Sequence, residues 1–142
     1  MKKKIVIGYT TGVFDLFHIG HVNILKKSKS LCDKLIVGVS KDNLVYKYKK
    51  KFPVIPQNER LKIVRNIKFV DYAIYQGSLN KFVNYKKLKF DIMFVGDDWF
   101  NTPKWKNLDE RFRKIGVKII YLPYTKSTSS TKINKILDKF RK

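Results

Sequence analysis

Strand-like and helix-like segments alternate along the whole chain of 142 residues, and this alternation limits the possible folds more than any other feature. Short apolar runs that end at Gly, Pro or polar clusters predict buried strands. Five such runs lie at residues 4–10, 34–40, 71–75, 90–95 and 117–122. Apolar residues at helical spacing predict helices at residues 20–31, 57–68, 79–88, 108–115 and 129–140.

Strands joined by helices favour an open, mostly parallel sheet with helices on both faces. We therefore predict an α/β fold, a Rossmann-like doubly wound sheet of about five parallel strands, as a single domain over residues 1–142. In such sheets ligands bind outside the carboxyl ends of the strands, where this chain places its polar clusters. The Lys- and Tyr-rich segment 42–56 is expected to be a long loop of the kind that often binds ligands.

The net charge of +21 comes mostly from lysines spread over nearly every expected helix. Such charge favours nucleic acids or anionic surfaces, and it also attracts phosphorylated substrates. Lys, Ile, Asn, Tyr and Phe share AT-rich codons, so genome composition explains the excess more simply than a nucleic-acid partner does. No apolar run is long enough to span a bilayer, and we expect no membrane insertion. The lone Cys32 cannot form an internal disulfide, which suits a cytoplasmic protein.

The sharpest motif is His18-Ile19-Gly20-His21, directly after the first expected strand, and it contains both histidines of the protein. Residues three apart lie on one side of a helical turn, and Gly20 allows a ligand to approach the backbone closely. The free N–H groups and the dipole of a helix start form an anion site, and the same field keeps imidazoles neutral. Two neutral donors would stabilise a phosphate that gains charge during phosphoryl or nucleotidyl transfer. A core histidine pair and a metal site are the alternatives, although zinc would need further Cys or His ligands.

Two charged clusters follow other strands. The basic run Lys47-Tyr48-Lys49-Lys50-Lys51 forms either a solvated face or a set of phosphate contacts. Asp97 and Asp98, followed by Trp99, form a solvated turn, a metal site or a set of hydroxyl acceptors for a polyol. Because this second cluster comes after a buried strand, we favour binding of the acceptor substrate there.

Hydroxyl side chains precede the last expected helix, after the fifth strand. Hydroxyls at a helix start act as N-caps, and backbone and hydroxyl groups there also bind phosphate. These hydroxyls lie in the segment 124–131.

The histidine motif resembles the His-x-Gly-His signature of a nucleotidyltransferase superfamily. Together with Gly96-Asp97-Asp98-Trp99 and Tyr121-Leu122-Pro123, it is most similar to the cytidylyltransferase branch and, within it, to glycerol-3-phosphate cytidylyltransferases. This resemblance implies direct attack by the acceptor phosphate on the α-phosphorus of CTP, with Mg²⁺ and no covalent intermediate. The implied products are CDP-glycerol and pyrophosphate.

The resemblance also implies roles for single residues. His18, His21, Lys49 and Lys51 would be catalytic, with Lys47 as a substitute in a loop one residue longer than usual. Acceptor binding would fall to Lys49, Arg60, Asp97, Asp98 and Trp99. The nucleotide would contact Thr11, Gly12, Val13, Phe14, Asp15, Gly20, Thr125, Ser129, Ser130 and Thr131. Tyr124 stands where the family has an Arg, which puts the exact substrate in doubt.

Three alternatives stay open. The first is another enzyme of the same class. The histidine signature does not separate CTP from ATP, so the protein could be an adenylyltransferase. It could also be a cytidylyltransferase for another acceptor, such as a sugar phosphate, another polyol phosphate or phosphocholine. A basic nucleic-acid-binding module would survive loss of both histidines and weaken steeply with salt. A degenerate relative would bind nucleotide without releasing pyrophosphate. The resemblance further implies a homodimer.

Overall fold

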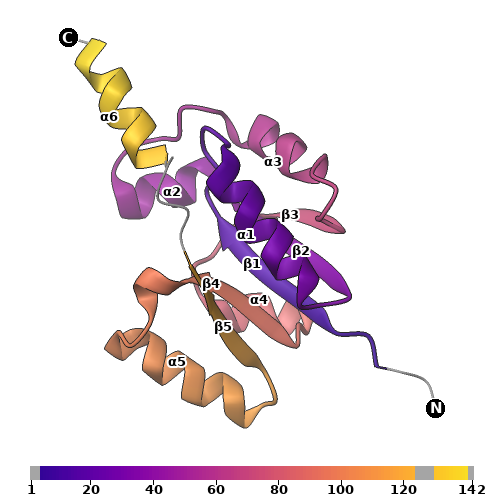
Figure 1. The fold of residues 1–142 in the computed structure, drawn as a ribbon. Helices are drawn as coiled ribbons and strands as arrows, with labels where there is room; N and C mark the ends of the chain where they lie inside the picture. The colour runs from indigo at the N-terminus through magenta and orange to yellow at the C-terminus, as the bar shows by residue number, and fades with distance from the viewer. Residues whose placement is uncertain (1–3, 124–129, 141–142) are drawn as a thin grey trace.

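The computed structural model describes residues 4–123 and 130–140, and its centre is one five-stranded parallel sheet. The strand order is β3-β2-β1-β4-β5, so the first strand lies in the middle and the chain winds outward from it twice. The strands are β1 (Ile7–Gly12), β2 (Lys34–Ser40), β3 (Tyr72–Gln76), β4 (Ile92–Gly96) and β5 (Lys118–Leu122). The predicted single-domain, Rossmann-like α/β fold is confirmed (Figure 1).

Helices cover both faces of the sheet. On one face, α1 (Ile19–Ser30) and α3 (Gln57–Arg65) pack Leu25, Leu61 and Val64 against the strands. On the other, α4 (Lys81–Leu88) and α5 (Pro103–Lys114) form a second, aromatic-rich cluster around Phe112. The remaining helical segments are α2 (Asp42–Lys49), the 3₁₀ turn η1 (Asp97–Trp99) and α6 (Ser130–Phe140).

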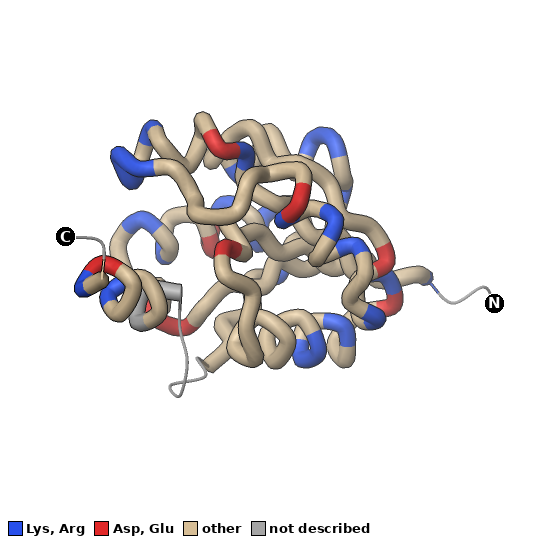
Figure 2. The backbone as a smooth tube through the Cα atoms, turned by 90° about the horizontal axis from the view of Figure 1, so that it is seen from above, with Lys and Arg blue, Asp and Glu red and all other residues tan. Residues whose placement is uncertain are grey.

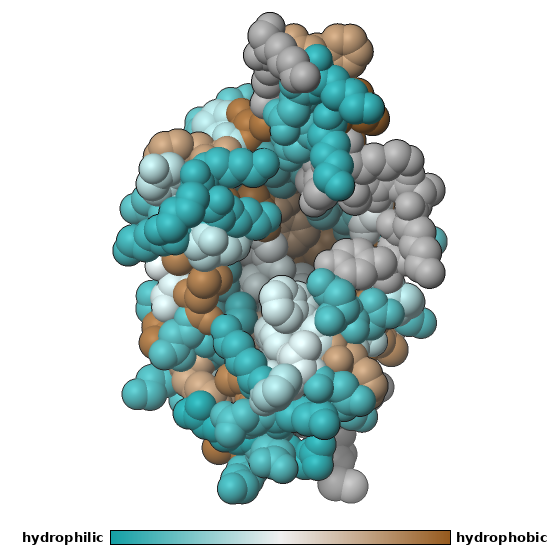
Figure 3. All heavy atoms as spheres, turned by 90° about the vertical axis from the view of Figure 1, so that its left-hand side faces the viewer, coloured by the Kyte–Doolittle hydropathy of each residue, from teal (hydrophilic) through white to brown (hydrophobic). Residues whose placement is uncertain are grey.

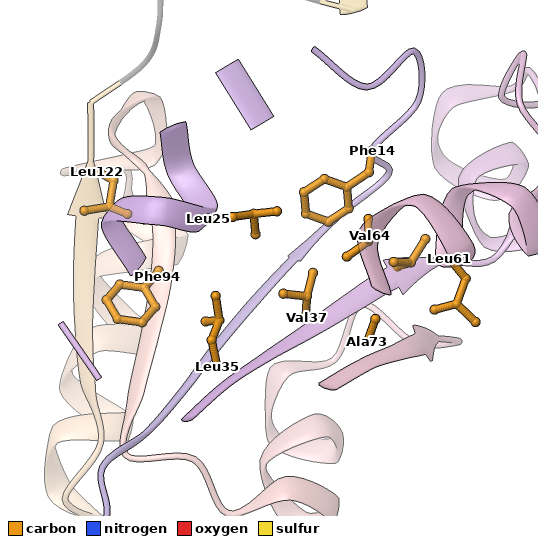
Figure 4. Packing of buried hydrophobic residues seen from close by; sticks show 10 residues of the cluster. Phe14, Leu25, Leu35, Val37, Leu61, Val64, Ala73, Phe94 and Leu122 are labelled. Carbon is orange, nitrogen blue, oxygen red and sulfur yellow. The ribbon is translucent and has the colours of Figure 1, made fainter. Parts of the chain in front are cut away.

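The first of these two cores reaches the region of the predicted site. Leu35 and Val37 alternate along β2 and face Leu25 of α1, while Phe14 closes the cluster at the carboxyl end of β1 (Figure 4). Full burial of each such side chain contributes about 1.5–3 kcal/mol relative to leaving it in water. The turn after β1 is therefore fixed to the core through a side chain of its own.

The predicted long loop over residues 42–56 is wrong in its first half, because residues 42–49 form α2. Leu44 and Val45 are buried while the lysines face outward, so this Lys-rich segment forms a short amphipathic helix. It ends at Lys50, whose φ of 59° is left-handed and stops the helix. Only residues 50–56 remain as a loop.

Two helix ends also differ from expectation. α3 ends at Arg65, three residues before the predicted end, since Asn66 and Ile67 close it with backbone bonds to residues 63 and 64. α5 begins at Pro103, five residues before the predicted start. Proline suits a first helical position, and the buried Trp105 anchors this added turn to the second core.

Lys and Arg lie around most of the outline of the molecule and do not gather on one side (Figure 2). Within the described ranges, no helix has the length and hydrophobicity that crossing a membrane requires.

Candidate nucleotidyl-transfer site

The turn that leads from β1 into α1 has a strained backbone. Phe14 and Leu16 have φ values of 55° and 50°, in the left-handed region that costs most non-glycine residues about 1–2 kcal/mol. The core holds Phe14 in place, with only 6% of its surface exposed. Strain of this kind persists where the surrounding structure fixes it, and such positions concentrate at functional sites.

The two histidines cap the start of α1 reciprocally. Nδ1 of His18 accepts the backbone N–H of Gly20 at 3.0 Å, and Nδ1 of His21 accepts the backbone N–H of His18 at 3.1 Å. Each Nδ1 must therefore lack a proton, so a neutral ring carries its proton on Nε2. The two ring centroids are 4.0 Å apart. The caps thus turn both imidazoles into side-by-side Nε2–H donors at a helix N-terminus.

Both rings favour the neutral form. Burial lowers the pKa of His18, and burial together with the neighbouring His18 lowers the pKa of His21 to about 4, against a smaller opposing effect of Asp15. The rings of Phe14 and Phe17, with centroids 5.4 and 5.0 Å from that of His21, supply much of this apolar surrounding. Neutral donors bind the ground-state phosphate less tightly than imidazolium would. Their hydrogen bonds strengthen as negative charge develops, so they stabilise the transition state more than the bound substrate.

Asp15 connects this turn to the loop after α2. Its carboxylate accepts the backbone N–H of Val54 at 2.8 Å and that of Ile55 at 2.9 Å. Hydrogen bonds to a carboxylate are about twice as strong as neutral ones, so the loop at residues 50–56 is held against the histidine turn.

Arg60 has a different place from the one predicted. It is 0% exposed, and its guanidinium donates to the carbonyls of Val13, Ser40 and Ile55 and forms an ion pair with Asp42. Four N–H groups are thus used inside the protein, and Arg60 is not among the residues that line the cleft described next. The expected contact with substrate phosphate is not made from this position, and the residue instead joins the ends of β1 and β2 to α2.

A cleft of about 1060 Å³ lies along the carboxyl edge of the sheet. The turn after β1 lines it from Thr11 to Asp15, and His21 lies beside that turn. Residues of α2 and the following loop form one wall, η1 and α5 form the opposite wall, and α6 contributes Asn134, Lys135 and Asp138. Figure 3, which looks onto the left-hand side of Figure 1, shows this face as a hollow with hydrophobic surface inside a hydrophilic rim.

A family model described as cytidylyltransferase-like matches residues 9–136, which include all these elements from β1 to most of α6. The chain belongs to the cytidylyltransferase-like family. A protein named FAD synthase from Pyrococcus abyssi is 36% identical over 138 residues, covering 94% of this chain and 89% of the relative. An FAD synthase from Thermococcus onnurineus is 35% identical over 143 residues, covering 97% and 92%. A lipopolysaccharide core biosynthesis protein from Thermoplasma volcanium has a TM-score of 0.72 at 30% identity over 88% of this chain and 100% of that one.

These relatives confirm that the protein is a nucleotidyltransferase of the family that the histidine motif indicates. They also overturn a prediction. The expected synthesis of CDP-glycerol is wrong, because relatives at 31–36% identity over nearly the full length are consistently named FAD synthase. The motif residues were sufficient to identify the superfamily and insufficient to identify the substrates.

The structure brings only some of the predicted family residues to the cleft. Lys49 and Lys51 line it, and Lys47 is not among the lining residues. Trp99 lines it with 49% of its surface exposed, whereas Asp97 and Asp98 are exposed beside it and do not line it. The predicted acceptor contact of these two aspartates stays a prediction.

The remaining predicted residues differ in how far the structure describes them. Gly20 is buried within α1 and does not line the cleft. Ser130 and Thr131 belong to the first turn of α6. Thr125 and Ser129 lie outside the described residues, as does Tyr124.

Sequence reasoning missed several residues that line the cleft. Lys81 at the start of α4 and Lys104 and Trp105 at the start of α5 reach it from the far face of the sheet. Gln76, at the end of β3, lines the cleft and donates to Ser40 Oγ at 3.0 Å. A helix start that follows a strand was the available signal, but in a chain with 32 Lys and Arg no single lysine stands out.

The fit of a metal ion was tested against the side chains present. Over residues 4–123 and 130–140, no three His, Cys, Asp or Glu side chains form a cluster that could hold one. Both carboxylate oxygens of Asp15 accept backbone N–H groups. A binding site built from protein ligands alone therefore does not fit here, whereas Mg²⁺ that arrives on nucleotide phosphates needs few protein ligands.

Proposed function

We propose that this protein is an FAD synthase that transfers the adenylyl group of ATP to the phosphate of FMN and releases pyrophosphate. The observation that carries the proposal is the FAD synthase name shared by relatives up to 36% identical that match 94–97% of this chain. FAD is the adenylyl derivative of FMN, so its synthesis is nucleotidyl transfer of the kind this family carries out. The alternative of an adenylyltransferase, which the histidine motif left open, therefore fits this protein better than CDP-glycerol synthesis does.

The cleft suits this pair of substrates better than it suits a polyol phosphate. Its volume of about 1060 Å³ is at the upper end of ordinary ligand sites, which fits two large substrates side by side. Apolar and aromatic side chains line much of it, among them Phe52, Leu79, Trp99 and Trp105. A flat aromatic isoalloxazine ring gains from such a lining, whereas glycerol phosphate, which is small and polar, does not.

The reaction needs positioning and charge and no protein nucleophile. An oxygen of the FMN phosphate attacks the α-phosphorus of ATP, a new P–O bond forms, and the bond to the β-phosphate oxygen breaks as pyrophosphate leaves. His18 and His21 would donate from Nε2 to phosphate oxygens whose charge rises in the transition state. The turn after β1 would bring its backbone close to the nucleotide.

Lys49 and Lys51 would neutralise phosphate charge from the wall that α2 and the following loop form. The bond from Asp15 to residues 54 and 55 supports this role, because it holds the lysine-bearing loop against the histidine turn. Mg²⁺ enters as the partner of the ATP phosphates, where it would neutralise charge on the leaving pyrophosphate. A homodimer and a cytoplasmic location stay predictions from the sequence.

The test is product formation from crossed substrates. Purified protein with Mg²⁺ is incubated with ATP or CTP and with FMN, riboflavin or glycerol-3-phosphate, and flavin nucleotides and pyrophosphate are quantified by chromatography and a coupled assay. We expect FAD and pyrophosphate in equal amounts from ATP and FMN, and none from riboflavin, which lacks the attacking phosphate.

A folded His21→Ala variant should form FAD about 10²- to 10³-fold more slowly than the wild type, and a Lys86→Met variant on the exposed side of α4 should match the wild type. Absence of FAD with folded wild-type protein, or equal turnover in the histidine variant, would contradict the proposal.

A further inference from the structure

Lys81 occupies a position that the reaction as described above does not use. It is the first residue of α4, it is only partly exposed, and it lines the cleft next to the carboxyl end of β1. Its Nζ donates to the hydroxyl of Thr11 at 3.4 Å. That threonine is the residue before Gly12 in the strand that leads into the histidine turn.

The charges around Lys81 are unusual for a lysine that is largely removed from water. Among the described residues no carboxylate forms a salt bridge with it, and the masked segments contain no Asp or Glu. Its charged neighbour is Lys104 of α5, which also lines the cleft, and burial together with this neighbour lowers the pKa of Lys81 to about 8. Lys104 is exposed, whereas Lys81 is partly buried, and a lysine charge in a partly dry site beside a like charge is unfavourable unless an anion joins them.

The backbone N–H groups at the start of α4 do not fill this role. Asn80 caps the helix and accepts the N–H groups of Phe82 and Val83. The anion would therefore be bound by the two lysine side chains, with the Thr11 hydroxyl beside them.

Lys81 and Lys104 reach the cleft from one face of the sheet and His21 from the other, while His18 is not among the lining residues. α1 carries His21 on one face, α4 and α5 carry Lys81 and Lys104 on the other, and the end of β1 lies between them. In an in-line displacement at phosphorus, the attacking and leaving oxygens also lie on opposite sides of the reacting atom. If the histidine side binds the ATP phosphates, the lysines lie on the side from which the attacking phosphate would approach.

We propose that Lys81 and Lys104 bind the phosphate of the acceptor, FMN, and so select a phosphorylated flavin over riboflavin. This inference rests on the proposed function and adds a substrate-specificity subsite to it. Loss of one charge-assisted hydrogen bond to phosphate corresponds to about a 10- to 100-fold weaker interaction.

The experiment compares FMN and riboflavin binding by equilibrium titration, without ATP, for wild type, Lys81→Met, Lys104→Met and Lys81→Arg. The wild type should prefer FMN by at least about tenfold. Lys81→Met should bind FMN no better than riboflavin, Lys104→Met should lose part of the preference, and Lys81→Arg should keep part of it. Lys86→Met, which removes the same charge from the same helix at an exposed position, should behave as wild type.

Steady-state assays complete the test: Lys81→Met should raise KM for FMN about 10- to 100-fold and change KM for ATP less than threefold. An FMN preference that survives in both methionine variants overturns the inference, and so does a rise in KM for ATP alone. If wild type forms no FAD, the proposed function itself fails. If wild type forms FAD and Lys81→Met is unaffected, only the lysine subsite fails.

Discussion

The cleft holds its donors in different ways on its two sides. On the histidine side, residues 11–21, the donors are neutral rings, and local contacts fix them: two caps, a core phenylalanine and Asp15. On the lysine side, Lys81 and Lys104, the donors are charged, and they meet only because α4 and α5 pack next to each other on the same face. Neighbours in sequence thus make the first arrangement, and the fold makes the second.

This difference explains why the histidine side is readable in the sequence. A ring that must act as a neutral Nε2–H donor needs its Nδ1 occupied, and a spacing of three residues at a helix start satisfies both rings at once. A lysine that binds an anion needs only a side chain that extends to the anion and partial burial, and many different surrounding sequences can provide these.

Arg60→Met should have the largest effect on stability, because the buried Arg60 side chain is bonded to three backbone carbonyls and to Asp42 next to the histidine side. Removing one partner of a buried ion pair costs about 3–5 kcal/mol of unfolding free energy, measured by urea denaturation. Arg65→Met, an exposed change on the same helix, should stay within about 0.5 kcal/mol of wild type. Equal losses in both variants would show that the network around Arg60 does not stabilise the fold.

His21 variants separate the two jobs of that ring. His21→Ala removes a transition-state donor and should lower kcat for FAD formation about 10²- to 10³-fold. His21→Gln keeps a side-chain acceptor for the N–H of His18, so it should keep most of the stability while losing most of the activity. A Gln variant as active as wild type would mean that the ring serves only as a cap.

Asp15→Asn tests the connection between the histidine side and the loop. An amide presents one acceptor oxygen, so the N–H of either Val54 or Ile55 loses its partner. We expect a loss of about 1–3 kcal/mol in unfolding free energy and a higher KM for ATP, since Lys51 lies in that loop. Unchanged values for both would show that the loop is positioned by other contacts.

The pH dependence of stability tests the neutral state of His21 in the folded protein. The folded pKa of His21 is about 4 against an ordinary value of 6.5, so between these values the unfolded chain binds a proton that the folded chain does not. Stability should therefore fall as pH drops from about 6.5 to 4, by at most about 1.4 kcal/mol per pH unit from this group. Urea denaturation at several pH values should give a shallower slope for His21→Gln. A slope that is identical in the variant would place the responsible group elsewhere.

The same contrast accounts for what the sequence could predict. The sheet, the α-helices other than α2 and the histidine motif depend on local patterns, and these were found. α2 was missed because its apolar face is only a few residues wide within a run of lysines. The internal bonds of Arg60 were missed because a basic residue near a phosphate site suggests a ligand contact, whereas only the fold reveals that its donors point inward. Lys81 was missed because its burial depends on two helices distant in sequence.

The two tryptophans of this protein, Trp99 and Trp105, both line the cleft, and their ring centroids are 6.3 Å apart. One is half-exposed and the other is 7% exposed, so they sample the mouth and the wall of the same cleft. All indole emission of the chain therefore originates where substrates are proposed to bind. The protein carries an intrinsic optical reporter, and occupancy of the cleft can be followed in real time on the unlabelled molecule.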